Sequence, residues 1–221
     1  RDGTTIPWDD GRRKDADEAL EDPDLEDTFR PPYPAGAGWR GPPAEGHDPG
    51  RARHDGLLAG LYGRDRKAVE ARLVRVPWMP GFTDLKVRVH GDHGVADAVR
   101  RVSEELARLP EPLRRLVLAP TSWNWRSIHG TTRLSAHARG IAIDLAMERA
   151  SYWRWDLKEV VRGLPPWRNT VPMEIVEVFE RHGFIWGGKW RHYDTMHFEY
   201  RPELLHPRCA ASTAAQTPGS P

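Results

Sequence analysis

Two segments of the chain carry side chains that could bind and use a metal ion. The first contains His137 and Asp144, and the second contains Asp194 and His197. Two imidazoles and one carboxylate form a donor set typical of catalytic zinc, which keeps one coordination position open for water. The additional carboxylate of Asp194 stands three residues before His197, where a general base could reach that water. Spacing alone supports a metal centre and an ordinary set of hydrogen-bonded side chains equally.

Two predicted strands are expected to position these side chains. In residues 196–200, the strand period of two puts His197 and Glu199 on the same face. Residues 140–145 read as a buried strand that carries Asp144, and a buried carboxylate needs a hydrogen bond, an ion pair or a metal. These two strands are therefore the expected frame of the site.

The remaining patterns mix strands with a few helices. Apolar alternation and short apolar runs predict strands over residues 73–78, 85–90, 115–119 and 184–186. Apolar stripes of helical period predict helices over residues 95–109, ended by Pro110, and from Pro172 to Gly183. A turn at Gly187-Gly188 is expected to join the last two strands. This mixture favours an α+β fold over a doubly wound parallel sheet.

The two ends of the chain differ in composition from its middle. Residues 1–54 are rich in Pro, Gly and acidic side chains, yet they contain large apolar residues that gain by docking on a surface. We therefore expect an extended arm that wraps a folded domain of residues 55–206, with a disordered linker as the alternative. Residues 207–221 are predicted to be a disordered tail, and they contain Cys209, the only cysteine, so no intramolecular disulfide can form.

Composition and charge limit the classes of function. The chain has 38% hydrophobic residues and a mean hydropathy of −0.68, and it contains no apolar run of the roughly 18 residues that a membrane span needs. Residues 1–35 hold 11 acidic and 5 basic side chains, which leaves 21 acidic and 28 basic ones in a modestly basic remainder. Such a balance suits an anionic polymer. The chain has no Gly-x-Ser-x-Gly sequence, which disfavours serine-hydrolase chemistry.

The order and spacing of two motifs resemble a known family of peptidases. Ser135-x-His137-x-x-Gly140-x-Ala142-x-Asp144 is followed by Trp190-x-x-x-Asp194-x-x-His197-Phe-Glu199. Together they resemble the zinc D-alanyl-D-alanine carboxypeptidase family, which includes VanY- and VanX-type enzymes and L-alanyl-D-glutamate endopeptidases of phage endolysins. The resemblance covers roughly residues 115–205. It implies a central antiparallel sheet with flanking helices, of the hedgehog and D,D-peptidase type, that holds a zinc ion.

The resemblance also implies a role for each matching residue. His137, Asp144 and His197 correspond to the zinc ligands, and Asp194 corresponds to the acidic residue that takes a proton from the water. Arg126 corresponds to the arginine that orients the substrate and steadies the developing oxyanion. Further candidates for supporting a ligand or contacting the substrate are Ser135, His192, Glu199 and Trp190, with His129 at the rim.

The implied function is zinc-dependent hydrolysis of peptide bonds in bacterial peptidoglycan stem peptides, with D-Ala-D-Ala carboxypeptidase activity preferred and L-alanyl-D-glutamate endopeptidase activity as the alternative. A non-catalytic zinc-containing binding module of the hedgehog-like type is the competing class, and the presence of both Asp194 and Arg126 favours the enzyme. The expected partner is a stem peptide or muropeptide rather than nucleic acid, and a monomer is expected. The start at Arg1 fits a trimmed, periplasmic or extracytoplasmic form, with the cytoplasm as the alternative.

Overall fold

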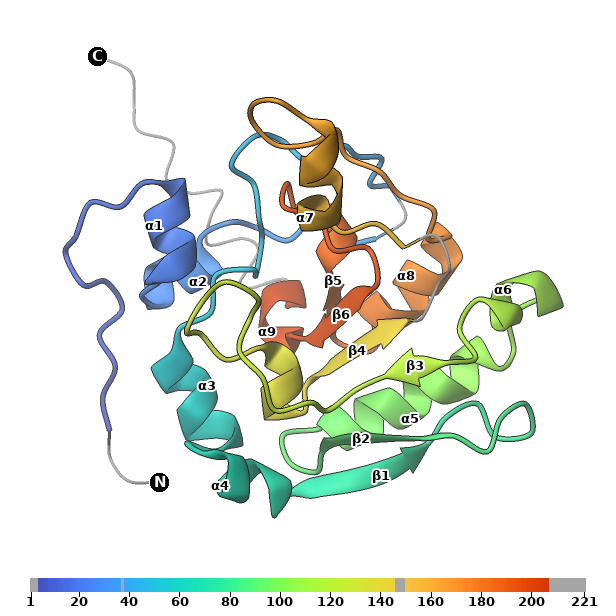
Figure 1. Cartoon of the computed structure of the whole chain (residues 1–221). Coiled ribbons are helices and arrows are strands. Elements are labelled where there is room, and N and C mark those ends of the chain that lie inside the picture. Colours follow the sequence, from blue (N-terminus) through green and yellow to red (C-terminus); the bar gives the residue numbers. More distant parts are fainter. Residues whose placement is uncertain (1–3, 37, 146–149, 207–221) are drawn as a thin grey trace.

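A four-stranded antiparallel sheet lies at the centre of the computed structural model, which describes residues 4–36, 38–145 and 150–206 (Figure 1). Its strands follow the order β3 (Pro120–Thr121), β4 (Ala142–Leu145), β6 (His197–Tyr200) and β5 (Phe184–Trp186), and each neighbouring pair is antiparallel. The predicted pairing of the last two strands is therefore present. The α+β class that the sequence predicts is confirmed, because this sheet is combined with helices rather than with parallel crossovers.

A separate antiparallel hairpin lies beside the central sheet. Strands β1 (Leu73–Pro77) and β2 (Lys86–His90) form it, close to the ranges that alternation predicts. Helix α5 (Val95–Leu106) packs against both strands and against α8 (Met173–Arg181), which in turn contacts β5. The apolar stripe of α5 is buried, as its helical period requires, at Val95, Ala98, Val99, Val102 and Leu106. These elements share one hydrophobic core beneath the sheet.

The strand predicted over residues 115–119 is wrong. Helix α6 (Glu111–Arg115) ends there, a turn follows, and the strand begins only at Pro120. Pro110 and Pro112 stand at the start of α6, where a helix needs no amide hydrogen from them, and the i,i+4 pair of Glu111 with Arg115 supports the turn. A short apolar run does not distinguish such a helix end from a strand.

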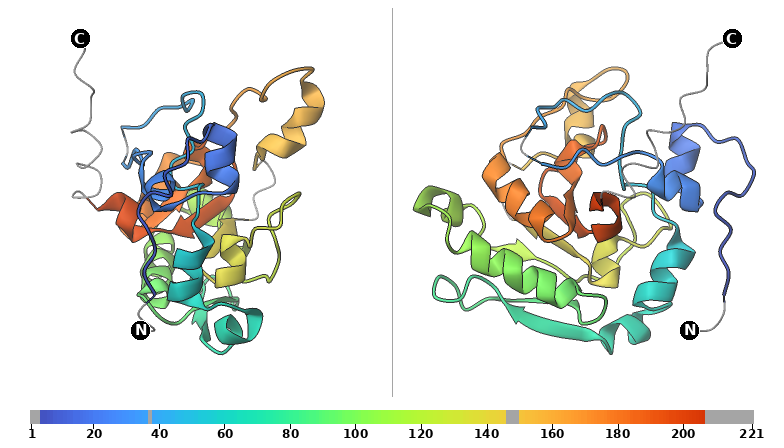
Figure 2. Two further views of the ribbon diagram at one scale, coloured as in Figure 1. Left: turned by 90° about the vertical axis from the view of Figure 1, so that its left-hand side faces the viewer. Right: turned by 180° about the vertical axis from the view of Figure 1, so that it is seen from behind.

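Gly187 and Gly188 lie in a 3₁₀ helix, η3 (Gly187–Lys189), rather than in a simple turn. A Cβ atom at Gly188 would lie 2.1 Å from the Trp186 ring, so only glycine fits against that buried indole. The remaining short elements are η1 (Ala136–Arg139), α7 (Trp153–Asp156), η2 (Leu157–Glu159) and α9 (Pro202–Leu205). Both views of Figure 2 show α7 standing away from α5 and the β1–β2 hairpin.

The N-terminal segment is not extended throughout. It contains α1 (Ala16–Glu21) and α2 (Leu25–Phe29), and each begins with a capping box formed by acidic side chains. The Tyr33 hydroxyl then donates a hydrogen bond of 2.6 Å to the Glu180 carboxylate, and Lys189 donates one of 2.7 Å to the Pro34 carbonyl oxygen. These contacts tie the segment to α8 and η3.

Helices α3 (Asp55–Tyr62) and α4 (Arg66–Glu70) connect the N-terminal segment to β1. Among the described residues, no helix is both long and apolar enough to cross a membrane. The tail predicted over residues 207–221 lies outside the described residues.

Candidate metal centre and its cavity

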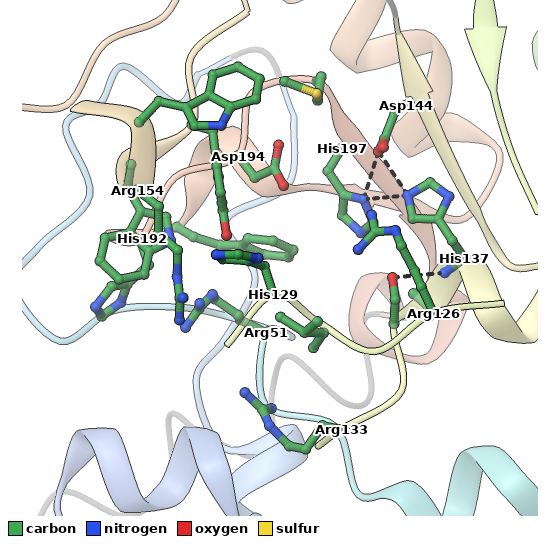
Figure 3. A pocket seen from close by; sticks show the side chains of 18 of the residues that line it. Arg51, Arg126, His129, Arg133, His137, Asp144, Arg154, His192, Asp194 and His197 are labelled. Carbon is green, nitrogen blue, oxygen red and sulfur yellow. Dashed lines mark hydrogen bonds and ion pairs between the residues drawn. The ribbon is translucent and has the colours of Figure 1, made fainter. Parts of the chain in front are cut away.

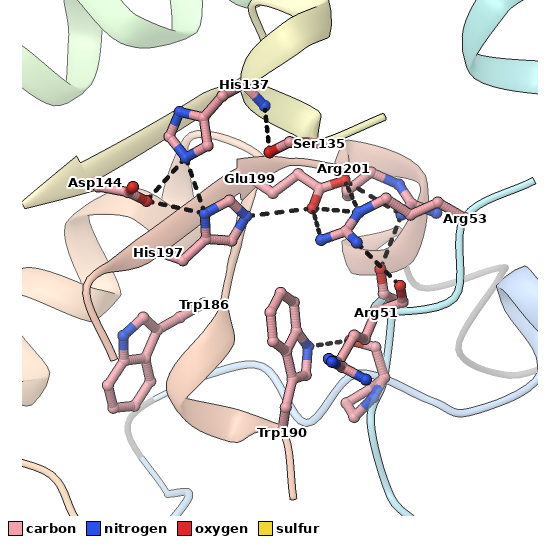
Figure 4. Close-up of polar contacts among 12 residues, drawn as sticks. Arg51, Arg53, Ser135, His137, Asp144, Trp186, Trp190, His197, Glu199 and Arg201 are labelled. Carbon is pink, nitrogen blue, oxygen red and sulfur yellow. Dashed lines mark hydrogen bonds and ion pairs between the residues drawn. The ribbon is translucent and has the colours of Figure 1, made fainter. Parts of the chain in front are cut away.

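Three potential metal ligands converge where β4 and β6 pair (Figure 4). Asp144 on β4 stands directly opposite His197 on β6, and His137 comes from η1. Oδ1 of Asp144 lies 2.9 Å from Nε2 of His137 and 2.9 Å from Nδ1 of His197. The two nitrogens are 3.2 Å apart. The structure therefore brings three sequence-predicted ligands to one point.

The turn before β4 directs His137 towards this point. The Ser135 hydroxyl begins η1 by accepting a hydrogen bond of 3.3 Å from the His137 amide, and Gly140 ends η1 at a left-handed φ of 72°. Nδ1 of His137 lies 2.7 Å from the Ser122 carbonyl oxygen. Because a carbonyl oxygen only accepts, Nδ1 carries the hydrogen and Nε2 is left with a lone pair facing the site.

The donor chemistry of this group fits a cation. When the imidazoles are neutral, the three facing atoms are all acceptors, so they need a positive charge between them, supplied either by a metal ion or by a proton on an imidazole. Bonds of 2.0–2.1 Å in a tetrahedral zinc site separate ligand atoms by ~3.3 Å, which is close to the observed spacing. Burial opposes ionisation of Asp144, yet the neighbouring His137 and His197 hold the pKa of this carboxyl group well below its usual range. Burial likewise opposes protonation of His197, but its bonds to Asp144 and Glu199 raise its pKa to about 9.

A second acidic group has different chemistry. Asp9, Asp10 and Asp24 lie close enough together to suggest a cation site, but Lys14 already supplies the charge. Its ammonium lies 2.9 Å from Asp10 and 3.2 Å from Asp24, and only 3% of its side chain is exposed. This cluster is a lysine–carboxylate network of the N-terminal segment.

Asp194 lies in the same cavity as the three ligands. Its Oδ1 atom is buried and accepts no hydrogen bond within the described part of the chain. Burial raises the pKa of this carboxyl group to about 6, although the neighbouring His197 opposes the rise. A carboxylate with a free acceptor atom and a raised pKa is suited to accepting a proton and returning it.

Glu199 supports His197 and is itself held by the N-terminal segment. Its side chain is fully buried, and Oε2 lies 3.5 Å from Nε2 of His197. Arg53 reaches the same carboxylate with Nε at 2.8 Å and Nη2 at 2.6 Å, and Arg201 lies 3.6 Å away (Figure 4). Burial disfavours the charged form, but Arg53 and His197 keep the pKa of Glu199 below its usual range. The predicted contact between Glu199 and His197 is therefore present, at the upper end of hydrogen-bond distance.

Trp190 and His192 are also tied to the N-terminal segment. The indole of Trp190 donates a hydrogen bond of 2.7 Å to the Pro49 carbonyl oxygen, and its ring centroid lies 5.7 Å from that of His197. His192 Nδ1 lies 2.8 Å from Asp48, whose other oxygen accepts from the His192 amide at 2.9 Å. His192 therefore lines the cavity with its ring fixed by Asp48.

Trp190 and His192 border a cavity of about 590 Å³ (Figure 3). Arg126, Ser135 and the rim candidate His129 line it together with the three candidate ligands and Asp194. The only hydrogen bond that we assign to the Arg126 side chain within the described residues is a 3.5 Å contact with the Ser127 carbonyl oxygen, so its guanidinium keeps most of its donors. Its exposure and position leave these donors available to a ligand in the cavity.

Sequence reasoning missed the contribution of residues 48–53. Asp48 and Arg53 contact candidate site residues directly, and Arg51 lines the cavity. No periodicity or motif marks these residues, because they lie in an irregular stretch rich in Pro and Gly. The only available signal was a pair of arginines close to the expected beginning of the folded domain.

Comparison with known proteins finds a family match for part of the chain. Residues 129–200 match the model of a family described as D-alanyl-D-alanine carboxypeptidase. This segment contains His137, Asp144, Asp194 and His197, whereas Arg126 and residues 48–53 lie outside it. No curated protein and no solved structure matches the chain significantly.

Proposed function

We propose that this chain hydrolyses peptide bonds in peptidoglycan stem peptides with the help of zinc, starting from the match of its residues 129–200 to the model of the D-alanyl-D-alanine carboxypeptidase family. One observation carries the proposal. Three converging donors stand in the same cavity as a buried carboxylate, Asp194, that has an unused acceptor atom. A purely structural metal site has no need of that carboxylate.

His137, Asp144 and His197 are the residues that would hold the ion, and their nitrogen and oxygen donors suit zinc. A bound zinc ion supplies a Lewis acid that polarises a carbonyl group and makes water more acidic. The chain itself supports the ligand geometry, since Ser122 fixes the tautomer of His137 and Glu199 faces the outer nitrogen of His197.

Asp194 would move the proton. As water adds to the scissile carbonyl carbon, one water proton passes to the Asp194 carboxylate. When the carbon–nitrogen bond breaks, the same proton passes to the leaving amine. The unpartnered Oδ1 atom of Asp194 leaves this carboxylate with an acceptor that can take the proton and release it again.

Arg126 would balance the negative charge that develops on the carbonyl oxygen. A guanidinium offers several hydrogen-bond donors in a fixed plane, and the Arg126 side chain spends few of them within the protein. Such preorganised donors stabilise an oxyanion more in a cavity than in water. Together, Asp194 and Arg126 support an enzyme over a non-catalytic binding module of the hedgehog-like type.

The preferred bond is D-Ala-D-Ala, with the L-alanyl-D-glutamate bond as the alternative within the same chemistry. We further propose that the enzyme acts outside the cytoplasm, because its polymeric substrate lies there. These assignments rest on the family of residues 129–200.

Mass spectrometry of purified muropeptides tests the function. Incubation with zinc-loaded protein should release D-alanine or cleave the stem, and a chelator should stop the reaction until zinc is restored. Asp194→Ala should abolish turnover while zinc stoichiometry stays near one, as measured by elemental analysis. Wild-type turnover in this variant would refute the assignment of the base. An unchanged muropeptide profile with fully zinc-loaded wild-type protein would refute the peptidase assignment.

A further inference from the structure

The charge of the cavity is strongly unbalanced. Six arginine or lysine side chains line it, whereas Asp144 and Asp194 are the only carboxylates among its described lining residues. Asp144 is itself a proposed ligand, and Asp194 lines the same cavity. The cations divide in space, because Figure 3 places Arg126 next to the ligand side and places Arg51, Arg133 and Arg154 across the cavity from it. The second group has no role in the proton transfer proposed above.

Two arginines of this second group lie over the ring of Trp153. The Arg51 guanidinium lies 5.9 Å and the Arg154 guanidinium lies 5.1 Å from the centre of its ring. The same ring meets His192 edge-on, with 4.7 Å between centroids. Within the described residues, neither Arg51 nor Arg154 has a carboxylate within ion-pair distance. Both charges therefore lie against an aromatic ring, and within the described residues the Asp48 carboxylate acts on Arg51 only from beyond ion-pair distance.

Buried donors without acceptors lie in the same place. In the described part of the chain, Nε of Arg133, Nε of Arg154 and the indole Nε1 of Trp153 are buried and make no hydrogen bond. Each such donor loses its bond to water on folding without gaining a replacement, which costs stability. Three unsatisfied donors among the lining residues of one cavity indicate a position that an acceptor-rich ligand would complete.

The electrostatic surroundings agree with this geometry. Burial, reinforced by neighbouring Arg53 and Arg133, lowers the pKa of Arg51, although Asp48 opposes the effect. Arg133 makes one ion pair, with Glu21 at 3.0 Å, but burial and the neighbouring arginines still lower its pKa. Like charges held together in a cavity repel each other, and an anion would relieve that repulsion.

We propose, building on the peptidase function above, that Arg51, Arg133 and Arg154 form a subsite for a carboxylate of the bound peptide, across the cavity from the bond that is cut. A carboxylate is the matching ligand because its two oxygens accept from planar guanidinium groups and from the indole donor. Arg51 belongs to the N-terminal segment, so this segment contributes to substrate selection. The subsite selects peptides that carry a second, correctly spaced negative charge.

A stem peptide offers two sources of this carboxylate. The probe is L-Ala-γ-D-Glu-L-Lys-D-Ala-D-Ala, prepared in three forms: unmodified, amidated at the D-glutamate α-carboxyl, and amidated at the C-terminus. Calorimetry with zinc-free protein measures binding without turnover. One amidation should weaken binding about tenfold, since a charge-assisted hydrogen bond contributes that much or more. The form that loses affinity identifies the carboxylate.

The variants are Arg154→Gln and the double variant Arg51→Gln/Arg154→Gln, with Arg100→Gln as the matched control on exposed α5 surface. The affinity difference between amidated and unmodified peptide should fall below about twofold in the double variant and stay about tenfold in the control. Arg51→Lys keeps a charge and should retain part of the difference, and it serves if the double variant does not fold.

Each outcome separates the subsite from the peptidase function. Equal binding of all three peptides to wild-type protein would overturn the subsite, as would a difference that persists undiminished in the arginine variants. Hydrolysis by zinc-loaded protein is measured on the same peptides. If wild-type protein discriminates in binding but hydrolyses none of them, the subsite stands and the proposed peptidase function fails.

Discussion

Replacing Arg53 with methionine should damage both the stability of the protein and its affinity for metal. Arg53 makes a two-point contact with Glu199, and the side chains are 9% and 0% exposed, respectively. Breaking a buried ion pair by removing one partner costs about 3–5 kcal/mol, because the other charge stays buried. Arg201 remains 3.6 Å from the carboxylate and offsets part of that loss. We therefore expect about 3 kcal/mol for Arg53→Met.

Urea unfolding of zinc-free protein measures this loss, by linear extrapolation at constant slope. Zinc affinity should fall about 10- to 100-fold, since Glu199 then no longer supports His197 in a fixed position. The control is Arg66→Met, which removes an exposed pair with Glu70 and should cost less than about 1 kcal/mol.

The double variant Arg53→Met/Glu199→Gln distinguishes an uncompensated charge from simple loss of packing. Without its charge, residue 199 no longer needs a cation, so the double variant should be more stable than Arg53→Met alone. A cost below about 1 kcal/mol for Arg53→Met, or a double variant that is less stable than either single variant, would refute this account of the buried pair.

Two further predictions concern packing and acid stability. Gly188→Ala should destabilise the protein by about 1–3 kcal/mol, because the new methyl group overlaps the Trp186 ring. Gly60→Ala is the control: it lies inside α3, its new methyl group meets no atom within 4 Å, and it should stabilise the protein by about 0.5–1 kcal/mol. Equal thermal midpoints for the two variants would contradict the packing argument. Burial opposes ionisation of Asp24, but backbone amides and Lys14 lower its pKa to about 2. Its contribution to stability is therefore complete above its unfolded pKa of about 3.9 and is lost as the pH falls towards 2. The hydrogen-exchange protection factors of α1 and α2, which are corrected for the intrinsic exchange rate at each pH, should fall as the pH drops through that window, and Asp24→Asn should remove this dependence. A pH profile of protection that Asp24→Asn leaves unchanged would contradict the prediction.

The sequence predicted the frame of the candidate site better than its surroundings. Alternation in residues 140–145 and 196–200 identified two strands, and their antiparallel register then places Asp144 opposite His197. Period-two patterning carries this information because one slip would move every side chain to the other face. The apolar run at 115–119 carried no such constraint, and it was assigned to a strand although a helix ends there.

The part that could not be predicted depends on contacts between distant segments. Asp48, Arg51 and Arg53 reach the site from an irregular stretch whose backbone follows no repeating pattern. Their partners are chosen by tertiary packing, and a local pattern cannot encode which buried carboxylate an arginine will meet. The capping boxes of α1 and α2 were readable in principle, because acidic residues three positions apart begin each helix.

The pairing of Arg53 with Glu199 has a consequence for how this protein can diverge. The two positions are 146 residues apart in the chain, yet each charge is stabilised mainly by the other in the largely buried environment that they share. Mutations at one position should therefore persist only alongside compensating mutations at the other. The two positions should covary among relatives as a single inherited unit, and those that lose one charge should show an apolar or neutral residue in place of the other.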